Sequence, residues 1–260
     1  MKLIYKALPA LLAGILLIYS GCKKTQDKPS SQSVDLQTLS SQIALNLAHS
    51  LNGSFGGVSV KDGLNGPSNV GASSTGSRLK VNDAVVGCGF LIDTGINYNT
   101  NIGDTIKSHV KGSIIYHYTC TAGAAIGYTV TDTLVTTGTA PGYTFYYDIT
   151  QDYVVTGLNV NSPIITLAGS LKGVVDLTYP NPKNSQHTDN AFVLTNLKID
   201  QSANYDVISG SATFVTRGHN SVGSWEFVGN MVFLGGHKAK VTFNAKSFIV
   251  DLITGTATPA

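Results

Sequence analysis

The sequence has few charged side chains, and nearly all of them are Lys or Asp. Only 12% of its 260 residues are charged, Glu226 is the only glutamate, and Arg78 and Arg217 are the only arginines. A helical bundle needs far more Glu, Lys and Ala, and a disordered chain needs more charge and fewer β-branched and aromatic residues. Nucleic-acid binding needs a basic stripe that two arginines do not supply. What remains is an ordered, β-rich, extracytoplasmic protein with little charge.

Recognisable catalytic and metal-binding motifs are also missing. The chain has no Gly-x-Ser-x-Gly elbow, no phosphate-binding loop and no His-Glu-x-x-His segment. The ligand pairs considered are His117 with Cys120, His109 with His117, and His219 with His237. Residues three apart on a strand point to opposite faces, and eight residues span about 26 Å. We therefore expect no metal site, no cofactor and no catalytic activity.

The first thirty residues carry an export signal. Lys2 and Lys6 precede an apolar run over residues 7–19, which suits a signal peptide and is shorter than the ~20 residues of a membrane-spanning helix. Ser20-Gly21-Cys22 then resembles the lipobox of bacterial lipoproteins. The resemblance implies a signal peptide over residues 1–21, acylation of Cys22, and a polar tether over residues 22–33.

The charges around the expected anchor indicate its location. Removal of residues 1–21 takes away two lysines and no acid, so 15 basic side chains remain against 15 acidic ones. Bulk charge then gives no attraction to anionic lipid or nucleic acid. Lys23, Lys24 and a lone Asp27 do not match the acidic cluster that marks surface export in Bacteroidota lipoproteins. We therefore expect the protein to be anchored in the outer membrane, with the periplasmic face favoured over the cell surface.

The segment after the tether predicts a helix over residues 34–51. Its leucines and isoleucine recur at spacings of three and four, Asp35 lies in the first turn, and Asn52-Gly53 is a stop signal. A Gly- and Ser-rich loop follows over residues 54–77, with short strands expected near Val58 and Val60.

The rest of the chain predicts strands joined by hairpins. Apolar and polar residues alternate through most of it, as in an antiparallel sheet with one buried face. Hairpin turns are expected at residues 218–220 and 235–237, a bulge near Asn196, and an Asn-rich loop over residues 180–190. Ala245 continues the inward-facing residues of the last expected strands.

These patterns predict one β-rich domain over residues 34–260. The expected fold is mainly β: an antiparallel meander sheet with the N-terminal helix packed on it. The alternation does not decide between a curved sheet, or half-barrel, and a sandwich.

Two cysteines remain after Cys22. Cys88 and Cys120 both share a parity with apolar neighbours, so both are expected to face inward. They are a possible disulfide in an oxidising periplasm, and two buried free thiols are the alternative. The absence of Cys-x-x-Cys argues against a redox role.

A tyrosine-rich segment and two short sequons are the other candidate sites. Tyr143, Tyr146, Tyr147 and Tyr153 could stack on sugars, although aromatic pairs also stabilise sheets. Asp104-Thr105-Ile106 and Asp132-Thr133-Leu134 resemble the O-glycosylation sequon of Bacteroidota, which makes Thr105 and Thr133 candidate acceptors.

The chain as a whole resembles Bacteroidota lipoproteins that have no assigned activity. The resemblance rests on Ser20-Gly21-Cys22, on residues 47–57 and on the closing strands over residues 223–255. It implies an envelope protein anchored by lipid, with a structural or binding role and an envelope protein as a possible partner. A periplasmic carrier of a hydrophobic ligand is the first alternative, and a glycan-binding module is the second.

Overall fold

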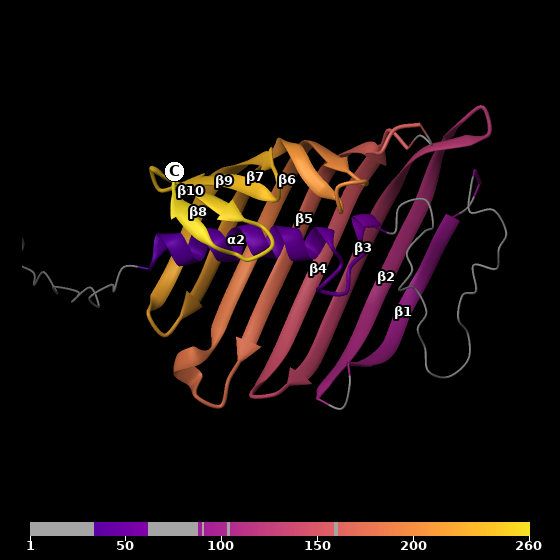
Figure 1. Cartoon of the computed structure of the whole chain (residues 1–260). Coiled ribbons are helices and arrows are strands. Elements are labelled where there is room, and N and C mark those ends of the chain that lie inside the picture. The colour runs from indigo at the N-terminus through magenta and orange to yellow at the C-terminus, as the bar shows by residue number, and fades with distance from the viewer. Residues whose placement is uncertain (1–33, 62–87, 90, 103–104, 159–160) are drawn as a thin grey trace, which may run out of the picture. The chain divides into compact units, whose positions relative to one another are not determined.

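A computed structural model describes residues 34–61, 88–89, 91–102, 105–158 and 161–260 of the chain. Eleven strands and one α-helix lie within these ranges, so the protein is mainly β, as the sequence predicts (Figure 1). The expected signal peptide, Cys22, the tether and residues 62–77 of the expected loop lie outside the described residues.

All eleven strands belong to one antiparallel sheet, and each strand pairs with its neighbours in the sequence. The expected meander is therefore confirmed, and the sandwich alternative is wrong. The sheet is open, with β1 and β11 at its edges. The strands are β1 (Leu91–Ile102), β2 (Ile106–Thr121), β3 (Ala124–Ala140), β4 (Tyr143–Thr156), β5 (Ile164–Thr178), β6 (Gln186–Asp200), β7 (Asp206–Asn220), β8 (Gly223–Gly235), β9 (Lys238–Phe243), β10 (Lys246–Asp251) and β11 (Ala257–Pro259).

The helix α2 (Leu36–Leu51) confirms the segment expected from the periodicity, with a start two residues later. Asp35 is its N-cap, because the carboxylate accepts hydrogen bonds from the backbone N–H groups of Gln37 and Thr38. The carboxylate also accepts a hydrogen bond from the Thr38 hydroxyl. That bond, together with the two backbone bonds, lowers the pKa of Asp35. The helix ends at Leu51, and Asn52 is its C-cap.

One face of α2 is buried against the sheet. Leu39, Ile43 and Leu47 are at most 1% exposed, and burial of each such side chain contributes about 1.5–3 kcal/mol. The helix contacts β5 and β6 and also β9, β10 and β11. Figure 1 shows the C-terminal strands curling over the helix, so α2 is covered from both sides. We call the face of the sheet toward α2 the inner face, and the opposite one the outer face.

The expected alternation holds along the strands. On β2, Ile114, Tyr116 and Tyr118 are buried on the inner face, whereas Ser113 and His117 are exposed. The bulge expected near Asn196 is also confirmed: the register between β6 and β7 shifts after Thr195, and Asn196 has φ 50°. A shifted register lets the inner-face parity change without exposing the core.

Three local expectations are wrong. Residues 58 and 60 form no strand, although Val58 and Val60 are buried at 2% and 3%. Residues 218–220 end β7, and the turn lies at residues 221–222. The loop expected over residues 180–190 is shorter, because β6 begins at Gln186 after a single 3₁₀ turn, η2 (Pro182–Asn184).

Ala245 is also placed differently from the expectation. It is exposed, and it forms a two-residue hairpin turn with Asn244 between β9 and β10. Both residues have positive φ, 48° and 58°. Tight hairpins favour that backbone because it matches the twist of the strands. The turn expected over residues 235–237 lies at Gly236 and His237, between β8 and β9.

Cys88 and Cys120 form a disulfide with their Cα atoms 5.7 Å apart. The inward orientation expected for Cys88 is wrong: it is exposed in a turn before β1, where strand parity does not apply. Cys120 is half-buried at the end of β2 and packs against the core. The bond therefore ties the chain that enters edge strand β1 to the neighbouring strand.

Reduction of this disulfide should lower the free energy of unfolding by about 3–4 kcal/mol, because it closes a loop with a sequence separation of 32. Urea denaturation of the wild type, with and without reductant, measures the change. The double variant Cys88→Ser, Cys120→Ser should match the reduced wild type and be insensitive to reductant. Equal stability of oxidised and reduced wild type would contradict the prediction.

Candidate functional site

The inner face of the sheet holds a segment without α-helix or strand, residues 52–61, as well as the helix α2. Backbone N–H and C=O groups buried outside helices and strands need other partners. Side chains of the sheet supply them. Three side chains donate to carbonyl groups of the segment: Thr136 Oγ1 to Phe55 (2.9 Å), Tyr153 OH to Val58 (3.3 Å) and Tyr128 OH to Val60 (3.4 Å). The Val58 N–H donates to Asp132 Oδ2 (3.0 Å). Gln151 Nε2 donates to the Ser50 carbonyl in the last turn of α2 (3.0 Å).

Asp132 is the buried acid of this arrangement. It is 1% exposed on β3, and its register partner on β4 is Gln151, which is fully buried. Burial raises the pKa of Asp132 to about 7, although the hydrogen bond from Val58 favours the charged form. Asp132 Oδ1 and Gln151 Oε1 have no hydrogen-bond partner among the described residues. When Asp132 is protonated, its carboxyl group could donate a hydrogen bond to Gln151 Oε1.

A second polar patch lies on the inner faces of β6, β7 and β8. Asn190 and Thr216 are register partners, and both are at most 1% exposed. The amide atoms of Asn190, the hydroxyl of Thr216 and Nε1 of Trp225 have no hydrogen-bond partner in the described part of the chain. No described base is therefore hydrogen-bonded to the Thr216 hydroxyl, and a nucleophile–base pair of the kind used in acyl transfer is not formed there.

A cavity of about 120 Å³ lies between α2 and the strands β6, β7 and β8. Its walls are mostly apolar and include Ala44, Ala48, Val60 and Phe233, with Lys61 among its polar residues. A cavity of ~150 Å³ in another protein holds benzene. This cavity is smaller, and so it is far too small for a lipid acyl chain.

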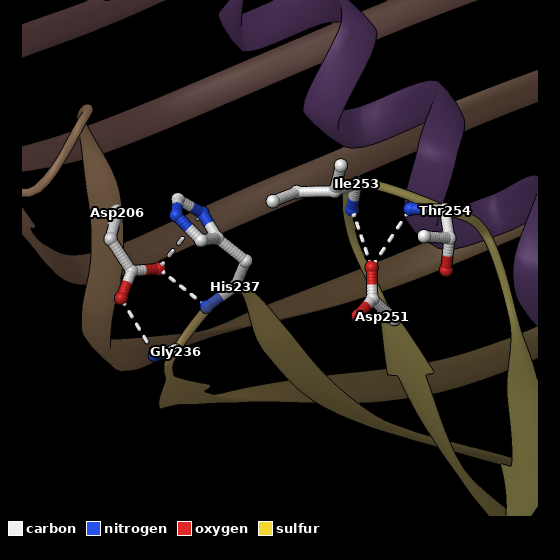
Figure 2. Close-up of polar contacts among 6 residues, drawn as sticks. All are labelled: Asp206, Gly236, His237, Asp251, Ile253 and Thr254. Carbon is white, nitrogen blue, oxygen red and sulfur yellow. Dashed lines mark hydrogen bonds and ion pairs between the residues drawn. The ribbon is translucent and has the colours of Figure 1, made fainter.

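Two turns beside the cavity are held by aspartates (Figure 2). Asp206 accepts hydrogen bonds from the N–H groups of Gly236 (2.7 Å) and His237 (2.9 Å), and His237 Nδ1 lies 3.4 Å from the same carboxylate. Asp251 accepts from the N–H groups of Ile253 and Thr254, and these bonds lower its pKa. Both carboxylates face backbone donors, which identifies them as turn anchors.

The structure separates the four candidate tyrosines. Tyr153 is buried at 1% in the core. Tyr146 is on the outer face, where its hydroxyl donates to Asp148 (3.5 Å). Tyr143 and Tyr147 are half-buried on the inner face. Only these last two of the four candidates offer ring faces on one surface.

Tyr143 and Tyr147 belong to a row of rings that the sequence reveals only in part. Phe145 lies between them and stacks on Tyr147 with ring centroids 5.0 Å apart. Tyr179 lies 5.3 Å from Tyr143, and Phe55 lies 4.7 Å from Tyr147. Parity places Phe145 in the row. Tyr179 and Phe55 come from other segments, so only the register and the packing reveal them.

The other sequence-based candidates are placed as follows. Thr105 is exposed in the turn between β1 and β2. Thr133 is exposed on β3, but the adjacent sequon residue Asp132 is buried beneath residue 58. Asp104, the acid of the sequon at Thr105, lies outside the described residues.

The outer face brings together two histidines that spacing along the chain does not. His187 on β6 and His219 on β7 are register partners, and their rings stack with centroids 5.0 Å apart. Asp176 on β5 is the next residue along the same row, and its carboxylate contacts His187 Nδ1 at 2.5 Å. The pairs considered from the sequence are not joined: His117 is exposed on the outer face, and Cys120 is in the disulfide.

No group of three or more His, Cys, Asp or Glu side chains in the described ranges is arranged to hold a metal ion by itself. No described helix is both long and apolar enough to cross a membrane. Comparison with protein-family models, with curated proteins and with solved structures found no match to the chain.

The raised pKa of Asp132 makes stability depend on pH. The folded-state pKa is about 7 against an ordinary 3.8, so folding favours the protonated form. The penalty is absent below pH ~4, grows as the pH rises, and is complete above pH ~7. A shift of three units corresponds to about 4 kcal/mol as an upper bound.

Asp132→Asn keeps the shape and cannot ionise. We expect it to unfold with about the wild-type free energy at pH 4 and to be more stable by up to about 4 kcal/mol at pH 8. Urea denaturation at both pH values measures the difference. Asp152→Asn, an exposed site on the neighbouring strand, is the control and should show no such divergence. A constant difference between Asp132→Asn and wild type across this range would contradict the assignment.

Proposed function

We propose that this protein is anchored by lipid in the bacterial cell envelope and acts by binding rather than by catalysis. The anchor is Cys22, and the site is the outer membrane, with its periplasmic face favoured. The support for the anchor is the Ser20-Gly21-Cys22 sequence after a short apolar run. The support for a binding role comes from how the sheet is filled.

The carrying observation is that the protein's own chain occupies the inner face of its sheet. The buried apolar residues from α2, from Val58 and Val60 and from the strands form one continuous cluster. Four hydrogen bonds with inner-face side chains fix the segment that fills this space, and a fifth fixes the end of α2. A carrier of a hydrophobic ligand needs a pocket of several hundred Å³, whereas two pockets beside α2 have about 120 and 210 Å³. This favours a binding surface over an interior ligand site.

A glycan-binding role is the second candidate, and the row of rings on β4 favours it. Tyr143, Phe145 and Tyr147 are half-buried on the inner face and are continued by Tyr179. Tyrosine presents an apolar ring together with a polar hydroxyl group. Such a row could pack against the apolar faces of sugar rings while its hydroxyl groups bond their edges.

Intact and native mass spectrometry of the full chain purified from membranes tests the first proposal. We expect the mature chain to begin at Cys22 with an acyl mass that survives organic extraction, because that mass is covalent. We expect no further lipid-sized mass that extraction removes. Cys22→Ala is the matched control and should lack the acyl mass and leave the membrane fraction. An extractable lipid bound to the folded chain would support the carrier alternative and contradict a self-filled core.

Affinity electrophoresis through gels that contain neutral polysaccharides tests the glycan candidate. Retardation of the wild type should be lost in Tyr147→Ala, whose ring lies in the inner-face row, and kept in Tyr146→Ala, whose ring lies on the outer face. Circular dichroism of both variants checks that the fold is intact. Equal migration of the wild type with and without every polysaccharide would remove this candidate.

A further inference from the structure

The geometry points to a binding site for a divalent transition-metal ion, Zn²⁺ or Cu²⁺, at His187 and His219 on the outer face, with Asp176 as a positioning residue. The inference is independent of the proposed binding function. Imidazole nitrogen is a preferred ligand of both ions. Water completes the coordination, because only two protein ligands converge, and this sets the expected affinity in the micromolar range.

The sheet register brings the ligands together. His187 and His219 are directly opposite each other on β6 and β7, and side chains in such pairs have Cβ atoms about 4.5–5.5 Å apart. Their ring centroids are 5.0 Å apart with an angle of 24° between the planes. Rotation of one ring about its Cβ–Cγ bond is needed to turn both lone pairs toward one ion, and that torsion is soft.

Asp176 prepares His187 for this role. Its Oδ1 contacts His187 Nδ1, so a neutral His187 places its proton on Nδ1 and leaves Nε2 as the free lone pair. A carboxylate behind a histidine in this way fixes the tautomer and the orientation of metal-binding imidazoles. Asp176 is 37% exposed and His187 is 34% exposed, so both remain open to an ion from solution.

The second histidine is open to solvent and has space beside it. His219 is exposed, and none of the described residues hydrogen-bonds to its ring. A depression of about 330 Å³ lies next to the pair. It is lined by Asp176, Pro182, Ser185, His187, His219 and Asn220, with four further residues. Metal-bound water has room there.

The neighbouring charges favour a cation. Asp189 follows His187 by two residues on the outer face of β6, and Arg217 precedes His219 by two residues on β7. The guanidinium of Arg217 is paired with Glu226 at 2.9 Å. Arg217 is also the register partner of Asp189. One cation therefore faces Asp189 and Glu226, and Asp176 adds a third carboxylate. When both imidazoles are neutral, these rows carry an excess of negative charge, which attracts a divalent ion.

Titration calorimetry with Zn²⁺ and electron paramagnetic resonance with Cu²⁺ test the site on the purified full chain without a histidine tag. We expect one ion per chain and a two-nitrogen Cu²⁺ spectrum. His187→Ala and His219→Ala should each weaken binding at least tenfold. Asp176→Asn should weaken it about tenfold and keep the two-nitrogen spectrum, which distinguishes a positioning residue from a ligand.

The matched control is His117→Ala, because His117 is also exposed on the outer face and has no histidine as a register partner. It should bind as the wild type does. A dissociation constant above 1 mM, or an equal loss of binding in His117→Ala and His219→Ala, would overturn the proposal. Thermal unfolding of each metal-free variant is measured in parallel. A loss of stability in His219→Ala with metal binding unchanged would show that the ring stack is only structural and would also overturn it.

Discussion

The constraint on which the structure depends is that one open sheet must bury a whole face without a second sheet. The chain meets it with α2 and with the irregular segment that follows the helix. An irregular segment brings backbone polar groups into an apolar interior, where each unpaired group costs free energy. Asp132, Gln151, Thr136, Tyr128 and Tyr153 pair with that backbone or with the end of α2. These buried polar residues therefore stabilise the fold.

The same constraint leaves the surface as the place where a partner can bind. Because the inner face is filled, the groups that remain free to meet a partner lie where α2 does not reach or on the outer face. The rings near Tyr143 and the imidazoles of His187 and His219 are two such groups. Both lie toward the end of the sheet that carries the β3–β4 turn and the β5–β6 connection, on opposite faces. One end of the domain thus holds both candidate binding surfaces.

Periodicity in the sequence predicts most of the fold, because it records which face of each element is buried. The helix, the meander and the bulge near Asn196 all follow from it. It fails where burial is not periodic: Val58 and Val60 are buried without a strand, and Cys88 is exposed in a turn. It also fails for the hairpin at Asn244 and Ala245, because that turn lacks the glycine that normally marks one. The choice of a single sheet depends on long-range pairing, which local alternation does not encode.

The candidate sites were harder to predict than the fold because they depend on register. His187 and His219 are separated by 32 positions in the sequence and meet only when β6 pairs with β7. Tyr179 joins the row on β4 from the far end of β5.

The composition is easier to explain. Short polar side chains accept hydrogen bonds from the backbone two residues on, and the structure uses Asp35, Asp200, Asp251, Asn181 and Asn220 in this way. A meander has many turns, and caps of this kind stabilise them. Asp176 differs from these caps, because its carboxylate contacts the imidazole of His187 and not the backbone of a turn.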